Sequence, residues 1–222
     1  MVNMNNIVLE LFIHKKFQQN MRFDSIPEIL DDVKQGKIII LLDDEREHEG
    51  DMIVAAEFAT PKNISFMMKY GCGIICMPIT MQLATTFKLD LFPRRNCDDL
   101  NDCFNTISVD ARGIGGISAN DRSKSIMTII SDESTANDIK TPGHLFPLLA
   151  KQGGVLERAG HTEASVDLAI LAGLKPAAAL VEVMNVEKDM PANNKELMDF
   201  ASEHKIKIST IKELKKYRES LL

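Results

Sequence analysis

A short apolar run leads directly into a crowd of carboxylates, and this junction constrains the fold and the chemistry of the chain more than any other segment. The run IIILL at residues 38–42 predicts a buried strand, and the carboxylates of Asp43–Asp51 follow it around a single arginine, Arg46. Crowded carboxylates repel one another, and their burial costs free energy unless a cation shares the site. Hard oxygen ligands suit Mg²⁺ or Mn²⁺. The segment is therefore a candidate metal site, with a solvated acidic turn as the alternative.

The size and charge of the chain limit the number of domains and the kinds of partner. The 222 residues are enough for one domain with a sizeable core. A formal net charge of −6 argues against a nucleic-acid-binding surface, whereas a few local cations still suffice to bind a phosphate group. We expect an N-terminal extension at residues 1–20, a candidate for disorder, and a single catalytic domain at residues 21–222.

The sequence also indicates the compartment. No apolar run approaches the roughly 20 residues needed to cross a bilayer, and no signal peptide is recognisable, so we expect neither membrane insertion nor secretion. The spacing of the cysteines is not that of a zinc site, and reduced thiols in the cytoplasm are the expectation for Cys72, Cys76, Cys97 and Cys103.

Strand and helix signals alternate along the chain. Start signals and apolar spacing predict helices that begin at Ser25, Thr60, Ser118, Thr162, 194 and Thr210. Apolar runs predict strands at 37–42, 52–58, 73–79, 104–110, 177–184 and 205–208, whereas 90–103 and 141–154 are expected to be irregular. This alternation predicts an α/β (α+β) fold, a single domain with a mixed β-sheet flanked by helices.

A second polar segment, Glu157–Glu163, has the features of an anion and metal site. Arg158 can bind a phosphate through two donors, and Thr162 begins a predicted helix whose free N–H groups attract anions. His161 is a potential metal ligand or acid–base group. The alternative is an ordinary helix start beside a surface histidine.

Three further residues stand out singly, and each has a structural alternative. His144 lies between two prolines and a glycine, where a purely structural histidine is the other interpretation. Cys76 ends the apolar run GII, and a buried, unreactive thiol is expected from its local sequence because no cation flanks it. Glu182 interrupts an apolar strand, so it either faces solvent or is held in an active site.

Together these segments resemble the 3,4-dihydroxy-2-butanone 4-phosphate synthase family of riboflavin biosynthesis. The motifs that carry the resemblance, in order, are REHEGD, GDMIVAAEFAT, GIIC, GISANDR, PGHLFPL, GGVLERAGHTEA and LAGLKPA. The resemblance implies a homodimeric lyase with active sites at the subunit boundary. It also implies an Mg²⁺-dependent conversion of D-ribulose 5-phosphate to L-3,4-dihydroxy-2-butanone 4-phosphate and formate.

Matched position by position, the resemblance implies a set of site residues. Glu47 and His161 would be the metal ligands. The residues that would act in catalysis are His144, Glu182, Asp51 and Cys76. The residues that would contact the sugar phosphate are Arg46, Glu47, Asp51, Arg158, Ala159, Gly160, His161 and Thr162. Carboxylates and histidines of this kind can move protons through enolisation, dehydration, rearrangement and loss of formate.

The chain departs from the family pattern at several positions. The acidic loop is one residue shorter before Arg46, and Thr141 and Leu149 stand where the family has arginines. An active lyase is the leading hypothesis. The alternatives are a non-catalytic paralogue that binds a sugar phosphate, or an enzyme that acts on a different phosphorylated sugar. The family's cyclohydrolase partner domain would have to come from another chain, since only an amphipathic helix follows Thr210.

Overall fold

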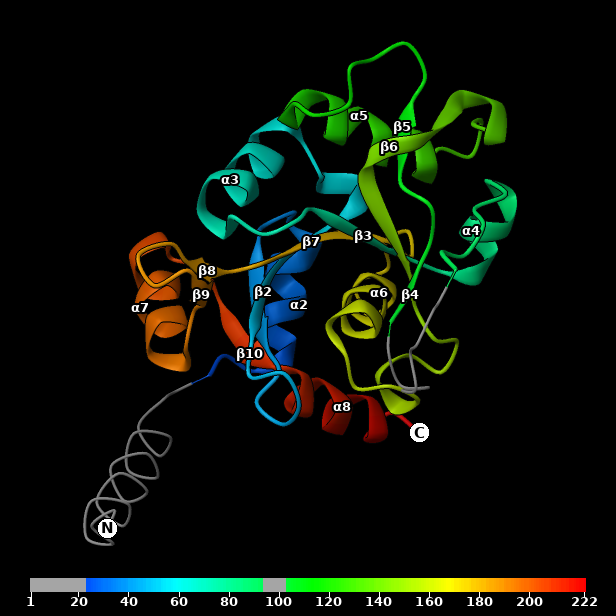
Figure 1. The fold of residues 1–222 in the computed structure, drawn as a ribbon. Helices are drawn as coiled ribbons and strands as arrows, with labels where there is room; N and C mark the ends of the chain where they lie inside the picture. The colour runs from blue at the N-terminus through cyan, green and yellow to red at the C-terminus, as the bar shows by residue number, and fades with distance from the viewer. Residues whose placement is uncertain (1–22, 94–102) are drawn as a thin grey trace, which may run out of the picture.

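The computed structural model describes residues 23–93 and 103–222, which form a mixed sheet with helices on both faces (Figure 1). The eight-stranded sheet has the order β10-β1-β2-β7-β3-β6-β4, and β5 also pairs with β6. β1 runs parallel to β10, and β3 runs parallel to β6, whereas the β1–β2, β2–β7 and β3–β7 pairs are antiparallel. The predicted mixed α/β architecture is confirmed.

The elements have the following bounds. The strands are β1 (Ile39–Leu42), β2 (Gly50–Ala55), β3 (Cys76–Ile79), β4 (Phe104–Asn105), β5 (Val109–Ala111), β6 (Ile139–Leu149), β7 (Ala178–Glu182), β8 (Met184–Asn185), β9 (Met190–Pro191) and β10 (Ile208–Thr210). The helices are α2 (Ile26–Lys34), α3 (Pro61–Gly71), α4 (Met81–Thr86), α5 (Ala119–Ile130), α6 (His161–Leu171), α7 (Asn194–His204) and α8 (Ile211–Glu219), with short 3-10 turns η1 (Ala56–Phe58), η2 (Ala136–Asp138) and η3 (Gly154–Leu156). None of the helices within the described ranges is long and apolar enough to cross a membrane.

Helix starts follow the capping signals of the sequence. Ser25 and Glu28 form a capping box at α2, and the side chains of Thr60 and Ser118 accept N–H bonds at the starts of α3 and α5. Asn193 caps α7, and Thr210 accepts the N–H of Glu213 at α8. These local bonds fix where each helix begins.

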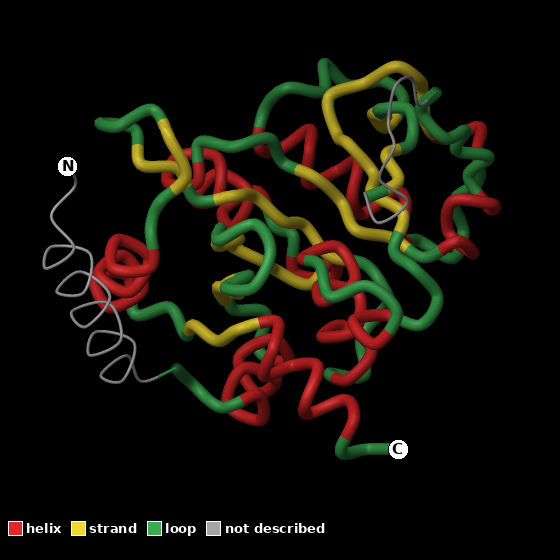
Figure 2. The backbone as a smooth tube through the Cα atoms, turned by 60° about the horizontal axis from the view of Figure 1, so that its bottom comes forward, coloured by secondary structure: helices red, strands yellow, loops and turns green. Residues whose placement is uncertain are grey.

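The two faces of the sheet bury two separate cores. On one face, α3, α5 and α7 cover alternate strand residues such as Met52, Val54 and Val181. On the other face, α2, α6 and α8 cover the intervening residues, including Leu41, Ile53 and Leu180. Figure 2 shows helices on both sides of the strands. Because strand side chains alternate between faces, each strand residue is assigned to one core by its position alone.

The structure corrects several predicted elements. Residues 141–154, predicted to be irregular, contain most of strand β6. Pro147 has no N–H to donate, but its carbonyl still joins the sheet by accepting the backbone N–H of Thr106. Helix α6 begins at His161 with Gly160 as its N-cap and no side-chain cap, so the prediction that Thr162 caps it was wrong.

Other predicted boundaries shift by a few residues. The run 104–110 divides into β4 and β5, and the C-terminal strand lies at 208–210 instead of 205–208. The strands predicted at 37–42 and 73–79 begin at Ile39 and Cys76. The predicted extension at 1–20 and most of the predicted loop at 90–103 lie outside the described residues.

Candidate active site

The acidic loop, strands β1, β2 and β7, and the start of α6 meet at one end of the sheet. Leu41 pairs with Asp51, and Asp51 pairs with Glu182, so the three residues lie side by side across the strands. By alternation all three belong to the face that α6 covers, since Ile53 and Leu180, two residues away, pack in that core. Positions 51 and 182 are far apart in sequence, and the sheet register alone brings them together.

His161 lies at the centre of this region, buried at the first position of α6. Its Nε2 lies 3.2 Å from the carbonyl oxygen of Leu41, so Nε2 donates and Nδ1 is left to face the carboxylates. Nδ1 lies 3.6 Å from Oε2 of Glu47 and 4.0 Å from Oδ1 of Asp51. Burial alone would lower the pKa of His161, but the surrounding carboxylates, above all Asp51 and Glu47, raise it to about 9.

The carboxylates around His161 respond to crowding in different ways. The His161 imidazolium lowers the pKa of Glu47, whose side chain is 41% exposed. Burial raises the pKa of Asp51, and burial together with Glu47 and Asp51 raises that of Glu49. Burial and then the negative charges of Glu49 and Asp51 raise the pKa of Glu182 to about 7. The region therefore holds more negative charge than its histidine can balance.

This arrangement fits a hard divalent cation. Oδ2 of Asp43 and Oε1 of Glu182 are buried without a hydrogen-bond partner within the described residues. An ion bonded at about 2 Å to Nδ1 of His161 and Oε2 of Glu47 needs these atoms roughly 3–4 Å apart, as they are here. Among residues 23–93 and 103–222 no three His, Cys, Asp or Glu side chains form a ready metal cage, so water or a ligand would have to complete the coordination.

Donors to an anion lie beside the acidic centre. In an α-helix the first N–H groups have no acceptor within the helix, and in α6 these belong to the turn that begins with His161 and Thr162. Arg46 bonds to the carbonyl of Ala159 at 3.2 Å and to Glu47 at 3.3 Å, which places its guanidinium between the two segments. The side chain of Arg158 pairs with buried Glu163 at 2.7 Å, so its predicted phosphate contact stays a prediction.

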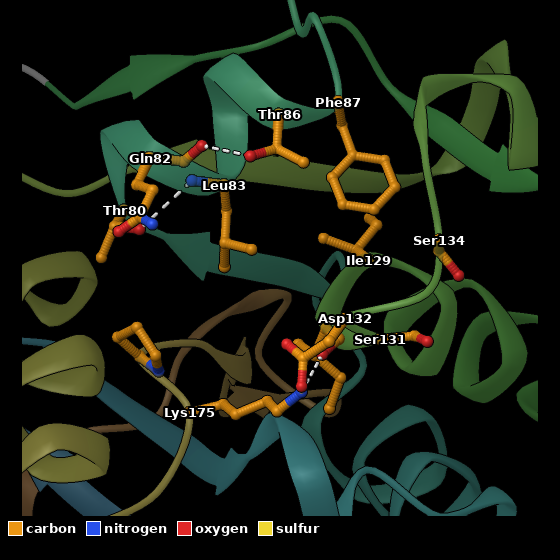
Figure 3. Close-up of a pocket in the computed structure, with 12 residues that line it drawn as sticks. Thr80, Gln82, Leu83, Thr86, Phe87, Ile129, Ser131, Asp132, Ser134 and Lys175 are labelled. Atoms are coloured by element: carbon orange, nitrogen blue, oxygen red, sulfur yellow. Dashed lines mark hydrogen bonds and ion pairs between the residues drawn. The ribbon is translucent and has the colours of Figure 1, made fainter.

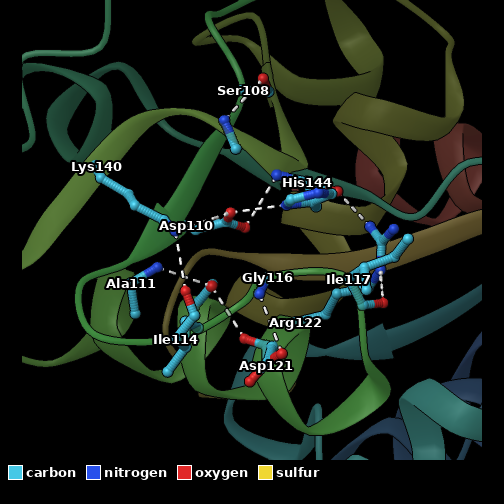
Figure 4. Close-up of polar contacts among 12 residues, drawn as sticks. Ser108, Asp110, Ala111, Ile114, Gly116, Ile117, Asp121, Arg122, Lys140 and His144 are labelled. Carbon is cyan, nitrogen blue, oxygen red and sulfur yellow. Dashed lines mark hydrogen bonds and ion pairs between the residues drawn. The ribbon is translucent and has the colours of Figure 1, made fainter.

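His144 lies in a second polar group, built around a buried acid that the sequence analysis did not identify (Figure 4). Asp110 is 1% exposed, and its carboxylate accepts the backbone N–H of His144 at 2.9 Å and contacts Nδ1 at 2.8 Å. This pair holds the ring so that Nε2 remains for another partner. Gly116 is required here, because a Cβ at this position would lie 2.2 Å from Asp110 and 2.3 Å from His144.

Cys76 lies between the two groups in the sheet. It pairs with Leu180 of β7 on one side and with Phe146 of β6 on the other. Burial raises the pKa of its thiol to about 12, so the thiol is neutral at physiological pH. Arg122, whose guanidinium bonds to the carbonyl of His144, is a further cation near this strand that the sequence analysis did not assign to the site. Burial lowers the pKa of Arg122, whereas Asp110 and Cys76 raise it.

A separate pocket of about 280 Å³ lies between α4 and the end of α5 (Figure 3). Hydroxyl groups of Thr80, Thr86 and Ser131 line it, and Lys175 pairs with Asp132 at 2.9 Å at its edge. None of the predicted site residues lines this pocket.

Comparison with known proteins decides the family. The sequence profile of 3,4-dihydroxy-2-butanone 4-phosphate synthases matches residues 27–217. The chain belongs to the 3,4-dihydroxy-2-butanone 4-phosphate synthase family. A synthase from Neisseria meningitidis serogroup A is 48% identical over 203 residues, which cover 89% of this chain and 55% of that protein. A riboflavin biosynthesis protein from Aquifex aeolicus is 45% identical over 206 residues, 90% of this chain and 50% of that protein. The chain thus spans about half the length of these curated relatives.

Solved structures of synthases share the fold. A two-domain synthase from A. baumannii superposes with a TM-score of 0.83 at 40% identity, covering 88% of this chain and 58% of that one. A synthase described as a complex with two magnesium ions superposes with a TM-score of 0.82 at 34% identity, covering 89% of this chain and 98% of that one. That chain is therefore matched over nearly its whole length.

Proposed function

We propose that residues 21–222 form a catalytic domain that converts D-ribulose 5-phosphate to L-3,4-dihydroxy-2-butanone 4-phosphate and formate, with Mg²⁺ or Mn²⁺. The convergence of Glu47, Asp51, His161 and Glu182 at one end of the sheet carries this proposal. Family membership supports it, because related proteins bear the name of the activity and one related structure holds magnesium ions. Glu47 and His161 would hold the ion, which supplies positive charge against negative charge that develops on substrate oxygens.

The first turn of α6 and nearby cations bind the sugar phosphate in this proposal. The first free N–H groups of α6 belong to the turn that begins with His161 and Thr162, and the guanidinium of Arg46 lies beside Ala159, two residues before that turn. Both groups favour an anion. The backbone around Ala159 fixes the position of Arg46. Arg158, which is paired with Glu163, adds positive charge next to the helix start.

Side chains with raised pKa values or a fixed orientation carry out proton transfer in this proposal. Glu182, with a pKa of about 7 before the ion binds, can both accept and donate a proton near neutral pH. Asp51, buried and raised in pKa, is a second such carboxyl group. His144, oriented by Asp110, presents Nε2 as an acid or base. Cys76 lines the site as a neutral thiol.

We infer that the active form is a homodimer in which His144 serves the partner's acidic centre. None of the described contacts joins His144 to Glu47, Asp51 or His161 within one chain. Exposed apolar side chains surround its strand, including Ile117 at 65%, Ile74 at 64% and Phe146 at 39%. Such side chains are typical of a surface that another subunit covers. The free thiols of Cys72 and Cys76 agree with a cytoplasmic setting.

The activity is tested directly with ¹³C-labelled D-ribulose 5-phosphate. With Mg²⁺ we expect formate and the four-carbon phosphate in equal amounts by NMR, and no product with EDTA. Glu47→Gln removes the activity, whereas Glu45→Gln is the matched control, because Glu45 pairs with Lys212 of α8 at 2.7 Å, away from His161. Folded protein that binds the sugar phosphate without releasing formate would instead establish the non-catalytic paralogue. Turnover of another phosphorylated sugar alone would establish a changed substrate.

The shared site is tested by mixing two inactive variants. In a dimer of one His144→Asn and one Glu47→Gln chain, one of the two sites combines an intact His144 with an intact Glu47. Random pairing makes about half of the dimers mixed, so about a quarter of wild-type activity returns. A site contained within one chain gives no recovery.

The departures from the family pattern have structural counterparts. Leu149 is buried, 6% exposed, in the core between Phe104 and Ile79, where it fills space. Thr141 lies on the surface. Neither replaces a residue of the acidic centre.

A further inference from the structure

A basic pocket lies on the face of the sheet opposite the acidic centre. It has a volume of about 490 Å³, within the range of small-molecule sites. One side of α3 along most of its length, the end of α7 and the segments next to β1 and β10 form its walls. Its apolar members Ile38, Phe66 and Tyr70 pack against the core that α3 and α7 cover, whereas Asp51 and His161 lie on the α6 side.

Three rings form one wall of this basic pocket. The ring centroids of Phe66 and Tyr70 are 4.6 Å apart, and His204 lies 5.3 Å from Phe66 and 4.7 Å from Tyr70. All three are half-buried, so their edges are fixed by packing while part of each ring remains accessible. A fixed, partly open group of rings suits stacking with a flat ligand, because little side-chain freedom is lost on binding.

Ammonium groups form the rim. Lys37, Lys62, Lys69 and Lys205 line the pocket, and within the described part of the chain no Asp or Glu lines it. Lys62 and Lys205 have no carboxylate partner among the described residues, and Lys69 lies over the Tyr70 ring, 4.7 Å from its centroid. Lys37 pairs with Asp32, which lies outside the pocket.

This rim contrasts with lysines of the neighbouring and C-terminal helices. On the exposed faces of α7 and α8, Lys195 pairs with Asp199 at 2.6 Å and Lys216 pairs with Glu213 at 2.6 Å. The whole chain carries a net charge of −6, yet Lys62, Lys69 and Lys205 line this pocket without a carboxylate partner among the described residues. Like charges that line one pocket repel one another, and an anion in the pocket relieves that repulsion.

We propose that this basic pocket binds a nucleoside phosphate, in addition to the sugar-phosphate site on the α6 face. The base stacks against the accessible part of Phe66, which Tyr70 and His204 hold in place, and the phosphate lies among the ammonium groups of Lys62, Lys69 and Lys205. A free inorganic anion contacts only the lysines of the rim, and an uncharged nucleoside contacts only the rings of the wall. A ligand with both parts uses the whole pocket.

Calorimetric titration of the full chain with AMP, GMP and UMP tests the proposal, without added Mg²⁺. We expect at least one of these nucleotides to bind at least about tenfold more tightly than both its nucleoside and inorganic phosphate. The double variant Lys62→Gln, Lys205→Asn weakens that binding about tenfold or more, and Phe66→Leu weakens it about threefold to tenfold. The asparagine is chosen because residue 205 has φ +55°, a conformation that asparagine adopts readily.

Lys195→Gln and Lys216→Gln are the matched controls, since they remove one positive charge each at exposed sites outside the pocket. They leave nucleotide binding unchanged, and formate production by the pocket variants stays at the wild-type level. Equal binding of nucleotide and phosphate overturns the proposal, as does an absence of nucleotide binding at millimolar concentration. Binding that survives the double variant also overturns it, because the nucleotide then lies elsewhere, for example at α6.

Discussion

The two histidines of the candidate site show how the number of neighbouring carboxylates determines what an imidazole can do. His161 is 7% exposed and faces Glu47 and Asp51, with Asp43 adding negative charge nearby. The side chain of His144 is 43% exposed and faces one buried acid, Asp110. The first region has surplus negative charge, whereas in the second region a single acid faces His144 and also pairs with Lys140 at 3.9 Å.

The surplus negative charge around His161 favours a cation, which can be a proton on the imidazole or a divalent metal ion. Without a metal the proton fills that role, and the pKa of His161 is therefore raised to about 9. A divalent ion can replace the proton because Nδ1 already points at the carboxylates. At His144 the single acid has another effect. It bonds to both the ring and the backbone N–H, so it fixes orientation and leaves Nε2 for a reacting group.

The largest expected effect comes from removing the imidazole at the acidic centre. His161→Asn should lower kcat/KM about 1,000-fold or more, because several kcal/mol of charge stabilisation depend on the ion it would hold. Mg²⁺ affinity should fall in the same variant. His48→Asn, an exposed position of the same loop with φ +57°, is the control and should change neither quantity. Wild-type Mg²⁺ affinity in His161→Asn would remove His161 from the metal site.

A smaller, separable effect is expected at the second histidine. Asp110→Asn keeps the shape of the side chain but loses the acceptor for Nδ1, so kcat should fall about 10–100-fold. Mg²⁺ affinity should remain within about twofold of wild type, which distinguishes this positioning residue from His161.

The control for Asp110 is a double variant. Asp110→Asn should add little to the loss already caused by His144→Asn, because the two residues act as one unit. Full additivity, or a fall in Mg²⁺ affinity like that of His161→Asn, contradicts the separation of the two regions.

Without a metal, thermal stability should depend on pH in a direction set by the acidic centre. His161 keeps its proton to about pH 9 when folded but only to about 6.5 when unfolded, so its stabilising effect is complete below 6.5 and is lost as pH rises toward 9. The pKa of Glu182 is raised to about 7 from its ordinary value of 4.5, which also makes stability fall as pH rises from 4.5 to 7. Tm of EDTA-treated protein should therefore decrease from pH 5 to 9.

One variant and added Mg²⁺ sharpen this stability test. Glu182→Gln should flatten the part of the Tm curve below pH 7, and saturating Mg²⁺ should reverse much of the loss above it, since the ion replaces the proton. A Tm that rises between pH 7 and 9 in EDTA would falsify the protonated state assigned to His161.

Local signals in the sequence predicted most of the helices, although α4 at Met81–Thr86 was missed, and they predicted the long-range strand pairings less well. Helix α7 occupies residues 194–204 as predicted, because Asn193 and Glu196 cap it through bonds between near neighbours. Strand β6 was missed because Pro142 and Pro147 indicate a break. A strand tolerates proline where no neighbouring strand needs a hydrogen bond from its backbone nitrogen. The position of the neighbouring strands decides this, and local sequence does not reveal it.

The site shows the same division between local and distant information. Glu47 and His161 were predicted from motifs, and the structure brings them to within 3.6 Å. Asp110 was missed because its partner, His144, is 34 residues away and no local pattern links them. An acid between Val109 and Ala111 in an apolar strand was the available signal, the same signal that singled out Glu182.

The smallest effect is expected at Cys76, the residue between the two regions. With a pKa of about 12 the thiol is neutral, so it serves as a small half-buried group and not as a nucleophile. Cys76→Ala should therefore lower kcat less than about tenfold, and Cys76→Ser should behave similarly. Rate assays on both variants, with Cys72→Ala as an exposed-thiol control, distinguish the alternatives. A loss of about 10,000-fold in Cys76→Ala, together with a covalent adduct on this thiol by mass spectrometry, would instead make strand β3 a third reactive element joining the two histidine regions.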